Sequence, residues 1–170
     1  MDLGATVCTP RKPQCLLCPW QAQCLALKAG RAAELPVKTR KLKRSRREHW
    51  CLWIEQGERT WVMQRPDTGV WAGLWTFPMW ADPQEADAVV RALQPEQIDA
   101  QPPVTHVLTH LDWVLHLTRV RVPTAVDVPA VLAAAQTGLE AGAAPATAHR
   151  PQGLASLGFP APFQRWLTGR

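Results

Sequence analysis

The chain has 170 residues, enough for one ordinary domain or for a small module followed by a compact domain. Hydrophobic residues make up 46% of it, yet no apolar run reaches the roughly 20 residues that cross a bilayer. The first ten residues lack the basic and then apolar layout of a signal peptide. We therefore expect a soluble, cytoplasmic protein that does not bind membranes.

The net charge of +5 is placed unevenly along the chain. Residues 28–48 show little apolar periodicity and contain a proline at position 36, so they are expected to be an interdomain connector. Such a basic connector is either solvated chain or a strap that contacts DNA phosphates. Its basic residues are Lys28, Arg31, Lys38, Arg40, Lys41, Lys43, Arg44, Arg46 and Arg47, opposed between residues 28 and 47 only by Glu34.

The character of the chain changes at residue 49. The runs "HWCLWIEQ" and "RTWVMQRP" are rich in Trp, Val and Ile and are separated by "GE", which predicts a β-hairpin over residues 49–66. "LWTFPMW" predicts a third strand that ends near Pro78. "DPQEADAVVRALQ" begins with Asp82 as a capping residue and continues with apolar residues at helical spacing, so it predicts a helix.

The second half continues this alternation. "PVTHVLTHLD" and "WVLHLTRVRVP" predict two more strands over residues 103–123, and "PAVLAAAQTGL" a short helix over residues 129–139. The Ala- and Pro-rich "EAGAAPATAHRPQG", residues 140–153, predicts a loop, and "APFQRWLTG" a last helix stopped by Gly169. The fold class expected for residues 49–170 is therefore α+β, a mixed sheet with flanking helices.

Four of the five cysteines lie near the start of the chain, with the spacing C-x6-C-x2-C-x5-C. In a reducing compartment, clustered thiols indicate metal ligation or redox chemistry rather than a disulfide framework. Four thiolates in one compact loop can surround a single centre, and both zinc and a cubane iron-sulfur cluster accept this ligand set. The residue types leave both open. The cysteines concerned are Cys8, Cys15, Cys18 and Cys24.

The stretch "MDLGATVCTPRKPQCLLCPWQAQC" resembles the iron-sulfur segment of the helix-hairpin-helix DNA glycosylases. Its "MDLGA" start and the domain that follows resemble the adenine DNA glycosylases of the MutY type, which remove adenine mispaired with 8-oxoguanine. The resemblance implies a segment over residues 1–27 with one 4Fe-4S cluster and with Cys51 outside it. It also implies that Arg11 and Lys12 contact DNA phosphates; a role in solubility is the alternative. The implied ligands are Cys8, Cys15, Cys18 and Cys24.

The stretch "WVMQRPDTGVWAGLWTFPMW" resembles the MutT or Nudix-like fold. Nudix hydrolases continue into a helix whose Arg-Glu and paired Glu residues bind magnesium around a diphosphate. Here Glu85, Asp87 and Glu96 do not form that arrangement. We therefore expect a Nudix-like domain over residues 49–170 that is kept for recognition.

In the MutY-type family a short Phe-Ser-His element probes the oxidised base. The matching place here holds Leu108, Thr109 and His110. A hydroxyl suits this task because 8-oxoguanine carries an N7 hydrogen and an O8 acceptor, whereas the N7 atom of guanine only accepts. The resemblance therefore implies that Thr109 and His110 contact DNA, while leucine in place of phenylalanine removes an aromatic surface. An ordinary strand end is the alternative.

The resemblance covers nearly the whole chain and implies the C-terminal part of a base-excision-repair adenine DNA glycosylase. In that family the catalytic residues lie upstream of the cluster, so we expect no catalytic residue in this chain and expect it to bind without cutting. The expected partner is double-stranded DNA with an A:8-oxoguanine or A:G mismatch, bound by a monomer at the bacterial nucleoid. The alternatives are a metal-binding module that contacts DNA or protein, and a Nudix hydrolase with an altered box.

Overall fold

The structure is a computed structural model that describes residues 2–37, 44–135 and 144–169. The chain divides into two compact units, Met1–Lys43 and Arg44–Arg170. Across the described ranges, no helix combines the length and the apolar character that spanning a membrane requires.

The first unit consists of short helical turns without a packed core. None of its described residues is buried, and the exposed fractions of Leu16, Leu17, Trp20 and Leu25 run from 63% to 86%. Folded units below about 40 residues usually need a metal, a disulfide or a partner. The turns are α1 (Leu3–Thr6), η1 (Cys15–Leu17), η2 (Gln21–Gln23), α2 (Leu25–Lys28) and η3 (Ala32–Glu34).

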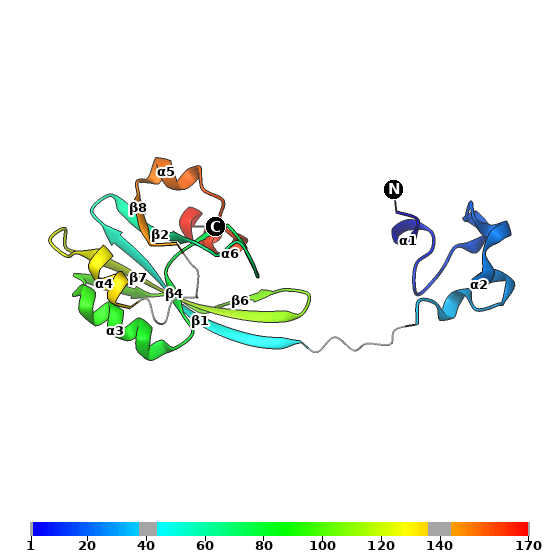
Figure 1. Ribbon diagram of the computed structural model, residues 1–170, viewed down its shortest axis with the longest axis horizontal. Helices are drawn as coiled ribbons and strands as arrows, with labels where there is room; N and C mark the ends of the chain where they lie inside the picture. Colours follow the sequence, from blue (N-terminus) through cyan, green and yellow to red (C-terminus); the bar gives the residue numbers. More distant parts are fainter. Residues whose placement is uncertain (1, 38–43, 136–143, 170) are drawn as a thin grey trace. The chain divides into compact units, whose positions relative to one another are not determined.

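The second unit is built on a mixed sheet. The central order is β3-β2-β1-β7-β5, while β4 pairs with β1, β6 with β7 and β8 with β2 (Figure 1). This arrangement confirms the predicted α+β class with a mixed sheet. The strands are β1 (Ser45–Gln56), β2 (Arg59–Gln64), β3 (Trp75–Thr76), β4 (Met79–Trp80), β5 (Gln97–Ala100), β6 (Val104–Val107), β7 (Leu111–Val122) and β8 (Thr147–His149).

The two longest strands form the centre of this sheet. β1 and β7 run parallel over their full lengths, from Ser45 opposite Leu111 to Gln56 opposite Val122. The other described strand pairs are antiparallel. Because the register starts at Ser45 and Leu111, the first residue of β1 lies beside the turn that joins β6 to β7. This register places the start of β1 beside the turn Leu108–His110.

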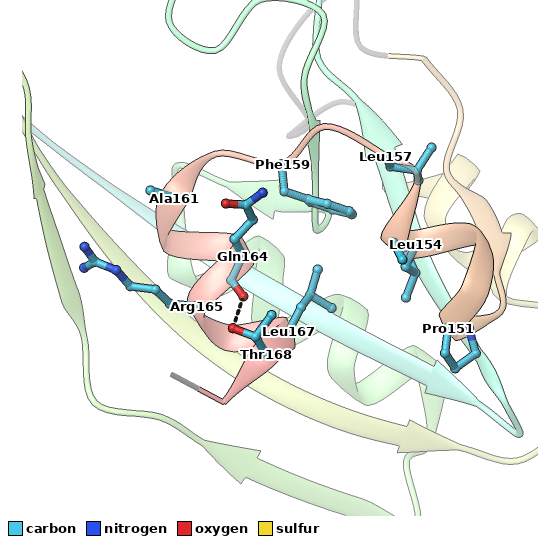
Figure 2. A pocket seen from close by; sticks show the side chains of 10 residues that line it. Pro151, Leu154, Leu157, Phe159, Ala161, Gln164, Arg165, Leu167 and Thr168 are labelled. Atoms are coloured by element: carbon cyan, nitrogen blue, oxygen red, sulfur yellow. Dashed lines mark hydrogen bonds between the residues drawn. The ribbon is translucent and has the colours of Figure 1, made fainter.

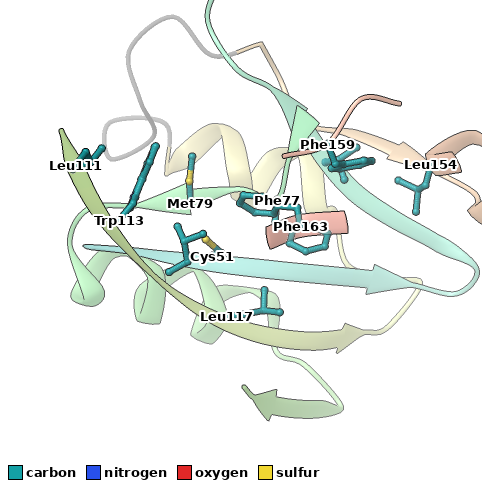
Figure 3. Close-up of a cluster of buried hydrophobic side chains, with 11 residues drawn as sticks. Cys51, Phe77, Met79, Leu111, Trp113, Leu117, Leu154, Phe159 and Phe163 are labelled. Atoms are coloured by element: carbon teal, nitrogen blue, oxygen red, sulfur yellow. The ribbon is translucent and has the colours of Figure 1, made fainter. Parts of the chain in front are cut away.

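Helices cover both faces of the sheet because side chains of a strand alternate between the faces. Cys51 belongs to one buried cluster together with Phe163, and Figure 3 shows this core beside the strands. The neighbouring Leu52 and Ile54 belong to a second cluster. α5 and α6 pack on the first cluster, and α3 and α4 on the second. The helices are α3 (Pro83–Leu93), α4 (Val128–Ala134), α5 (Pro151–Ala155) and α6 (Ala161–Thr168).

Several predicted elements differ from the observed ones. β1 begins at Ser45 rather than at residue 49, because its first residues pair with β7. The stretch 140–153, predicted as a loop, contains β8 and the start of α5, since β8 gains an edge position beside β2. Pro78 separates β3 from β4 in the predicted third strand. Residues 136–139 of the predicted helix lie outside the described residues.

Candidate metal centre and nucleic-acid interface

The first candidate site is a cavity of about 390 Å³ in the first unit. All four N-terminal cysteines line it, although the spacing along the chain separates them. Two helical turns bring the later three together: the amide of Cys18 donates to the carbonyl of Cys15 at 3.2 Å, and that of Cys24 to Gln21 at 3.3 Å. Cys8 is exposed, and the other three are partly buried.

The donor set and the volume of this cavity fit a group of several atoms. A water molecule occupies about 30 Å³ of liquid, so the cavity has room for far more than one ion. Within residues 2–37, 44–135 and 144–169, no three His, Cys, Asp or Glu side chains are grouped to hold a single metal ion. The four cysteines nevertheless line one and the same cavity. This arrangement suits a cubane of iron and sulfide held by four thiolates.

Two basic side chains stand on the loop between the first two cysteines. The hydroxyl of Thr9 donates to the carbonyl of Lys12 at 2.9 Å, and the amide of Gln14 to that of Val7 at 2.9 Å. These bonds close the loop and leave Arg11 and Lys12 exposed. Neither forms an ion pair with another described residue, so both charges remain accessible to a phosphate.

The fifth cysteine belongs to the other unit. Cys51 lies in β1 and is completely buried in the first core cluster. Burial raises the pKa of its thiol far above the ordinary value, because the thiolate would lose its hydration. Cys51 is thus a core residue of a strand, as the sequence predicts.

The second candidate site is the turn Leu108–His110 between β6 and β7. It is closed by a hydrogen bond of 2.8 Å from the amide of Leu108 to the carbonyl of Leu111. Thr109 and His110 are exposed at this turn, whereas the side chain of Leu108 is partly buried and packs against the first core cluster. The structure therefore brings Thr109 and His110 together on the surface, in a turn rather than at a strand end.

Arg44 and Ser45, at the start of the second unit, donate hydrogen bonds to this turn. The guanidinium of Arg44 donates to the carbonyl of Leu108 at 3.2 Å and forms an ion pair with the carboxylate of Asp112. The amide of Ser45 donates to the carbonyl of His110 at 3.0 Å. The hydrogen bond from Arg44 lowers the pKa of Asp112, and the same bond raises the pKa of Arg44. Sequence reasoning placed Arg44 in the connector and assigned no role to Ser45 or Asp112.

No local signal reveals these three residues as partners of the turn, because Arg44 and Asp112 stand 68 positions apart. Only the parallel register of β1 and β7 brings them together. The middle of the basic connector, residues 38–43, lies outside the described residues.

A further cavity, of about 610 Å³, lies between α5 and α6. Figure 2 shows that Leu154, Phe159 and Leu167 line it, while Thr168 donates a hydrogen bond of 2.9 Å to the carbonyl of Gln164. Leu154 and Phe159 also belong to the first core cluster. Its lining is mainly apolar, and it gathers no set of side chains suited to acid-base or metal chemistry.

The acidic residues of the region that follows the Gly-rich turn are dispersed. Glu85 and Asp87 lie on α3, and Glu96 follows it. In the part of the chain that the structure describes, these three residues belong to no group that holds a metal ion.

These features match two known families. Residues 49–169 match the NUDIX domain, and this chain belongs to the NUDIX domain family. Residues 8–24 match the iron-sulfur binding domain of endonuclease III, which spans the four cysteines of the first cavity. The chain thus carries an iron-sulfur binding segment for one 4Fe-4S cluster, followed by a NUDIX domain.

The curated relatives that the chain matches carry the name adenine DNA glycosylase. The protein from Mus musculus is 31% identical over 162 residues, covering 69% of this chain and 31% of the relative. The protein from Arabidopsis thaliana is 34% identical over 106 residues, covering 54% and 17%. The protein from Buchnera aphidicola subsp. Schizaphis graminum is 32% identical over 78 residues, covering 46% and 22%. This chain therefore spans less than a third of the length of these relatives.

Solved structures agree on the fold. The NUDIX domain of NrtR from Shewanella oneidensis, a complex with ADP ribose, aligns with a TM-score of 0.51 and 12% identity over 83% of this chain and 94% of its own. The MutT protein from Methanosarcina mazei Go1 aligns with a TM-score of 0.51 and 15% identity, over 76% and 95%. Together with the matching families and relatives, these findings confirm the resemblance to the C-terminal portion of MutY-type adenine DNA glycosylases.

Proposed function

We propose that this chain is the DNA-binding and lesion-recognising part of a base-excision-repair adenine DNA glycosylase that removes adenine opposite 8-oxoguanine or guanine. The observation that carries the proposal is the joint presence of a four-cysteine cavity and a NUDIX domain in one chain whose relatives are adenine DNA glycosylases. Residues 1–27 serve as the cluster segment, residues 28–48 as the connector and residues 49–170 as the recognition domain. The protein acts as a monomer at the bacterial nucleoid.

In the first unit, Cys8, Cys15, Cys18 and Cys24 hold the cluster. These four thiolates would hold a 4Fe-4S cluster, which would cross-link the loop through iron-thiolate bonds and would supply no hydrolytic chemistry. The unit has no buried residue among those described, so these bonds replace the missing core. The exposed charges of Arg11 and Lys12 then bind phosphates of the duplex, and the release of counterions favours this binding.

In the second unit, the turn Leu108–His110 reads the base. The hydroxyl of Thr109 both donates and accepts, so it can pair with the N7 hydrogen or the O8 atom of 8-oxoguanine. His110 is exposed beside it and offers a ring for a polar or stacking contact. Leu108 packs on the core, which supports the turn from within.

The test compares two duplexes that differ only in 8-oxoguanine or guanine opposite adenine. We expect the iron-loaded chain to bind the 8-oxoguanine duplex more tightly. Thr109→Val should reduce the ratio of the two dissociation constants by about fivefold, because it removes one hydrogen bond worth about 1 kcal/mol. Thr124→Val is the matched control, since Thr124 is exposed in the loop after β7.

Equal affinity of the unmodified chain for both duplexes would overturn lesion recognition. A colourless protein with one zinc per chain would favour the interaction module, because an iron-sulfur cluster absorbs broadly in the visible range. Magnesium-dependent release of pyrophosphate from nucleotides would favour a Nudix hydrolase.

A further inference from the structure

We propose that Arg44 is a positioning residue that holds the turn Leu108–His110 in the shape with which Thr109 and His110 meet the lesion. This inference rests on the proposed recognition role of that turn. Arg44 is the first residue of the second unit and directly precedes β1. Its hydrogen bonds to described residues go to the carbonyl of Leu108 and the carboxylate of Asp112, so it acts on the turn through the backbone.

The guanidinium of Arg44 bridges the first residue of the turn and the start of β7. On one side it donates to the carbonyl of Leu108 at 3.2 Å. On the other side it pairs with Asp112, its Nε lying 3.4 Å from one carboxylate oxygen and its Nη2 contacting the other. A planar guanidinium presents several donors in a rigid fork, so one side chain can fix two acceptors at a set separation.

Ser45 completes the arrangement from the next position. Its amide and its hydroxyl both donate to the carbonyl of His110, at 3.0 Å and 3.3 Å. The carbonyls of the first and last residues of the turn thus accept hydrogen bonds from Arg44 and Ser45, respectively. The side chains of Thr109 and His110 form no hydrogen bond with another described residue and remain exposed. A fixed backbone with free polar side chains is what a recognition turn requires.

A purely stabilising role explains this arrangement less well. The side chains of Arg44 and Asp112 are 45% and 37% exposed. Ion pairs at such exposure contribute little to stability, because water and salt screen them. β6 has only four residues and pairs with β7 alone among the described strands, so its turn has few other restraints. The effect of Arg44 therefore falls on the shape of the turn rather than on the stability of the domain.

The experiment compares Arg44→Ala with Arg46→Ala in the iron-loaded chain. Arg46 lies in β1, is exposed and pairs with Glu48 at 2.8 Å, so its loss removes the same charge without removing the hydrogen bond that Arg44 donates to the turn. Both variants should lose similar overall DNA affinity, because each releases one counterion fewer. Only Arg44→Ala should reduce the preference for the 8-oxoguanine duplex over the guanine duplex, by about fivefold.

A second variant separates charge from position. Asp112→Asn removes one negative charge, which raises the net charge of the chain by one, and should keep or raise the overall affinity for DNA. It also weakens the bridge from Arg44, so the preference for 8-oxoguanine should fall. A purely electrostatic role of Arg44 predicts no such opposite movement. Arg44→Lys keeps the charge without the fork, and we expect it to restore overall affinity but not the full preference.

Amide hydrogen exchange measures the effect of Arg44 on the turn directly. The amide hydrogen of Leu108 is bonded to the carbonyl of Leu111. Its exchange with solvent should become faster in Arg44→Ala and should not change in Arg46→Ala. If Arg44→Ala fails to fold, Asp112→Asn and Arg44→Lys decide the question. If Thr109→Val lowers the preference while Arg44→Ala leaves it unchanged, this inference is wrong and the recognition role of the turn stands. If the unmodified chain shows no preference, the proposed function itself fails.

Discussion

At the scale of single residues, the turn Leu108–His110 is held by backbone hydrogen bonds as well as by its side chains. Leu108 stands where the resembling family has phenylalanine, and its side chain packs inward on the first core cluster. Its neighbour Val107 is 63% exposed. Val107, two positions before Thr109, is therefore an exposed apolar residue of this segment, which the sequence did not reveal because strand periodicity alone does not show which face of an edge strand is open.

The carboxyl of Asp112 provides a direct test of the bridge to Arg44. The hydrogen bond from Arg44 lowers its pKa below the ordinary value of 3.8. A lowered folded-state pKa means that the stabilisation is present above the ordinary value and is lost as the pH falls through the lowered one. NMR titration of the Asp112 carboxyl should therefore show a midpoint below 3.8, and Arg44→Ala should move it upward. An unmoved midpoint would contradict the bridge in solution.

At the scale of elements, local sequence accounts for α3 almost completely. The carboxylate of Asp82 accepts the amide hydrogen of Gln84 at 2.8 Å, Pro83 opens the first turn, and the helix ends at Leu93. The buried residues Ala86, Val89 and Leu93 are at the spacing from which the helix was predicted. The helix needs no distant partner to be recognised, because its cap and its apolar face both lie within Asp82–Leu93.

Removing the carboxylate of Asp82 that caps α3 should lower the stability of the second unit. We expect Asp82→Ala to reduce the free energy of unfolding of the second unit by about 1 kcal/mol, since an amide at the start of α3 loses its acceptor. Asp87→Ala is the matched control, because Asp87 is exposed on α3 and accepts no capping bond. Urea denaturation followed by Trp fluorescence measures both. Equal losses in the two variants would contradict the capping role.

Elements that depend on distant partners were predicted less well. β8 lies in an Ala- and Pro-rich stretch that looks like a loop, yet it pairs with β2 at Thr60 and Val62. The start of β1 is basic and looks like connector, yet it pairs with β7. In both cases a neighbouring strand supplies the hydrogen bonds, and that strand is remote in sequence.

At the scale of the whole molecule, the two units draw their stability from different sources. Residues of the second unit form two buried clusters, whereas no described residue of the first unit is buried. The first unit instead places four thiols around one cavity. The integrity of Met1–Lys43 should therefore depend on the iron-sulfur cluster, and that of Arg44–Arg170 should not.

Two cysteine substitutions, one in each unit, test this difference. Cys18→Ser should abolish visible absorption and make the first unit sensitive to protease, while the near-UV circular dichroism of the buried Trp80 and Trp113 stays intact. Cys51→Ala is the matched control and should retain the visible absorption. It should lower the free energy of unfolding of the second unit by about 1 kcal/mol, because burying a group of the size of the lost thiol contributes about that much. Loss of the second unit's signal in Cys18→Ser would show that the units are not independent.

The sequence by itself determined the features that depend on near neighbours: the cysteine spacing, the capped α3, and the dispersed acidic residues where a hydrolase needs a cluster. Only the tertiary structure decided how the turn Leu108–His110 is held. Arg44 and Ser45 reach the turn because β1 and β7 lie parallel and in register, with Ser45 opposite Leu111. Local patterns arise from interactions a few residues apart, whereas this contact depends on which strands the whole fold places side by side.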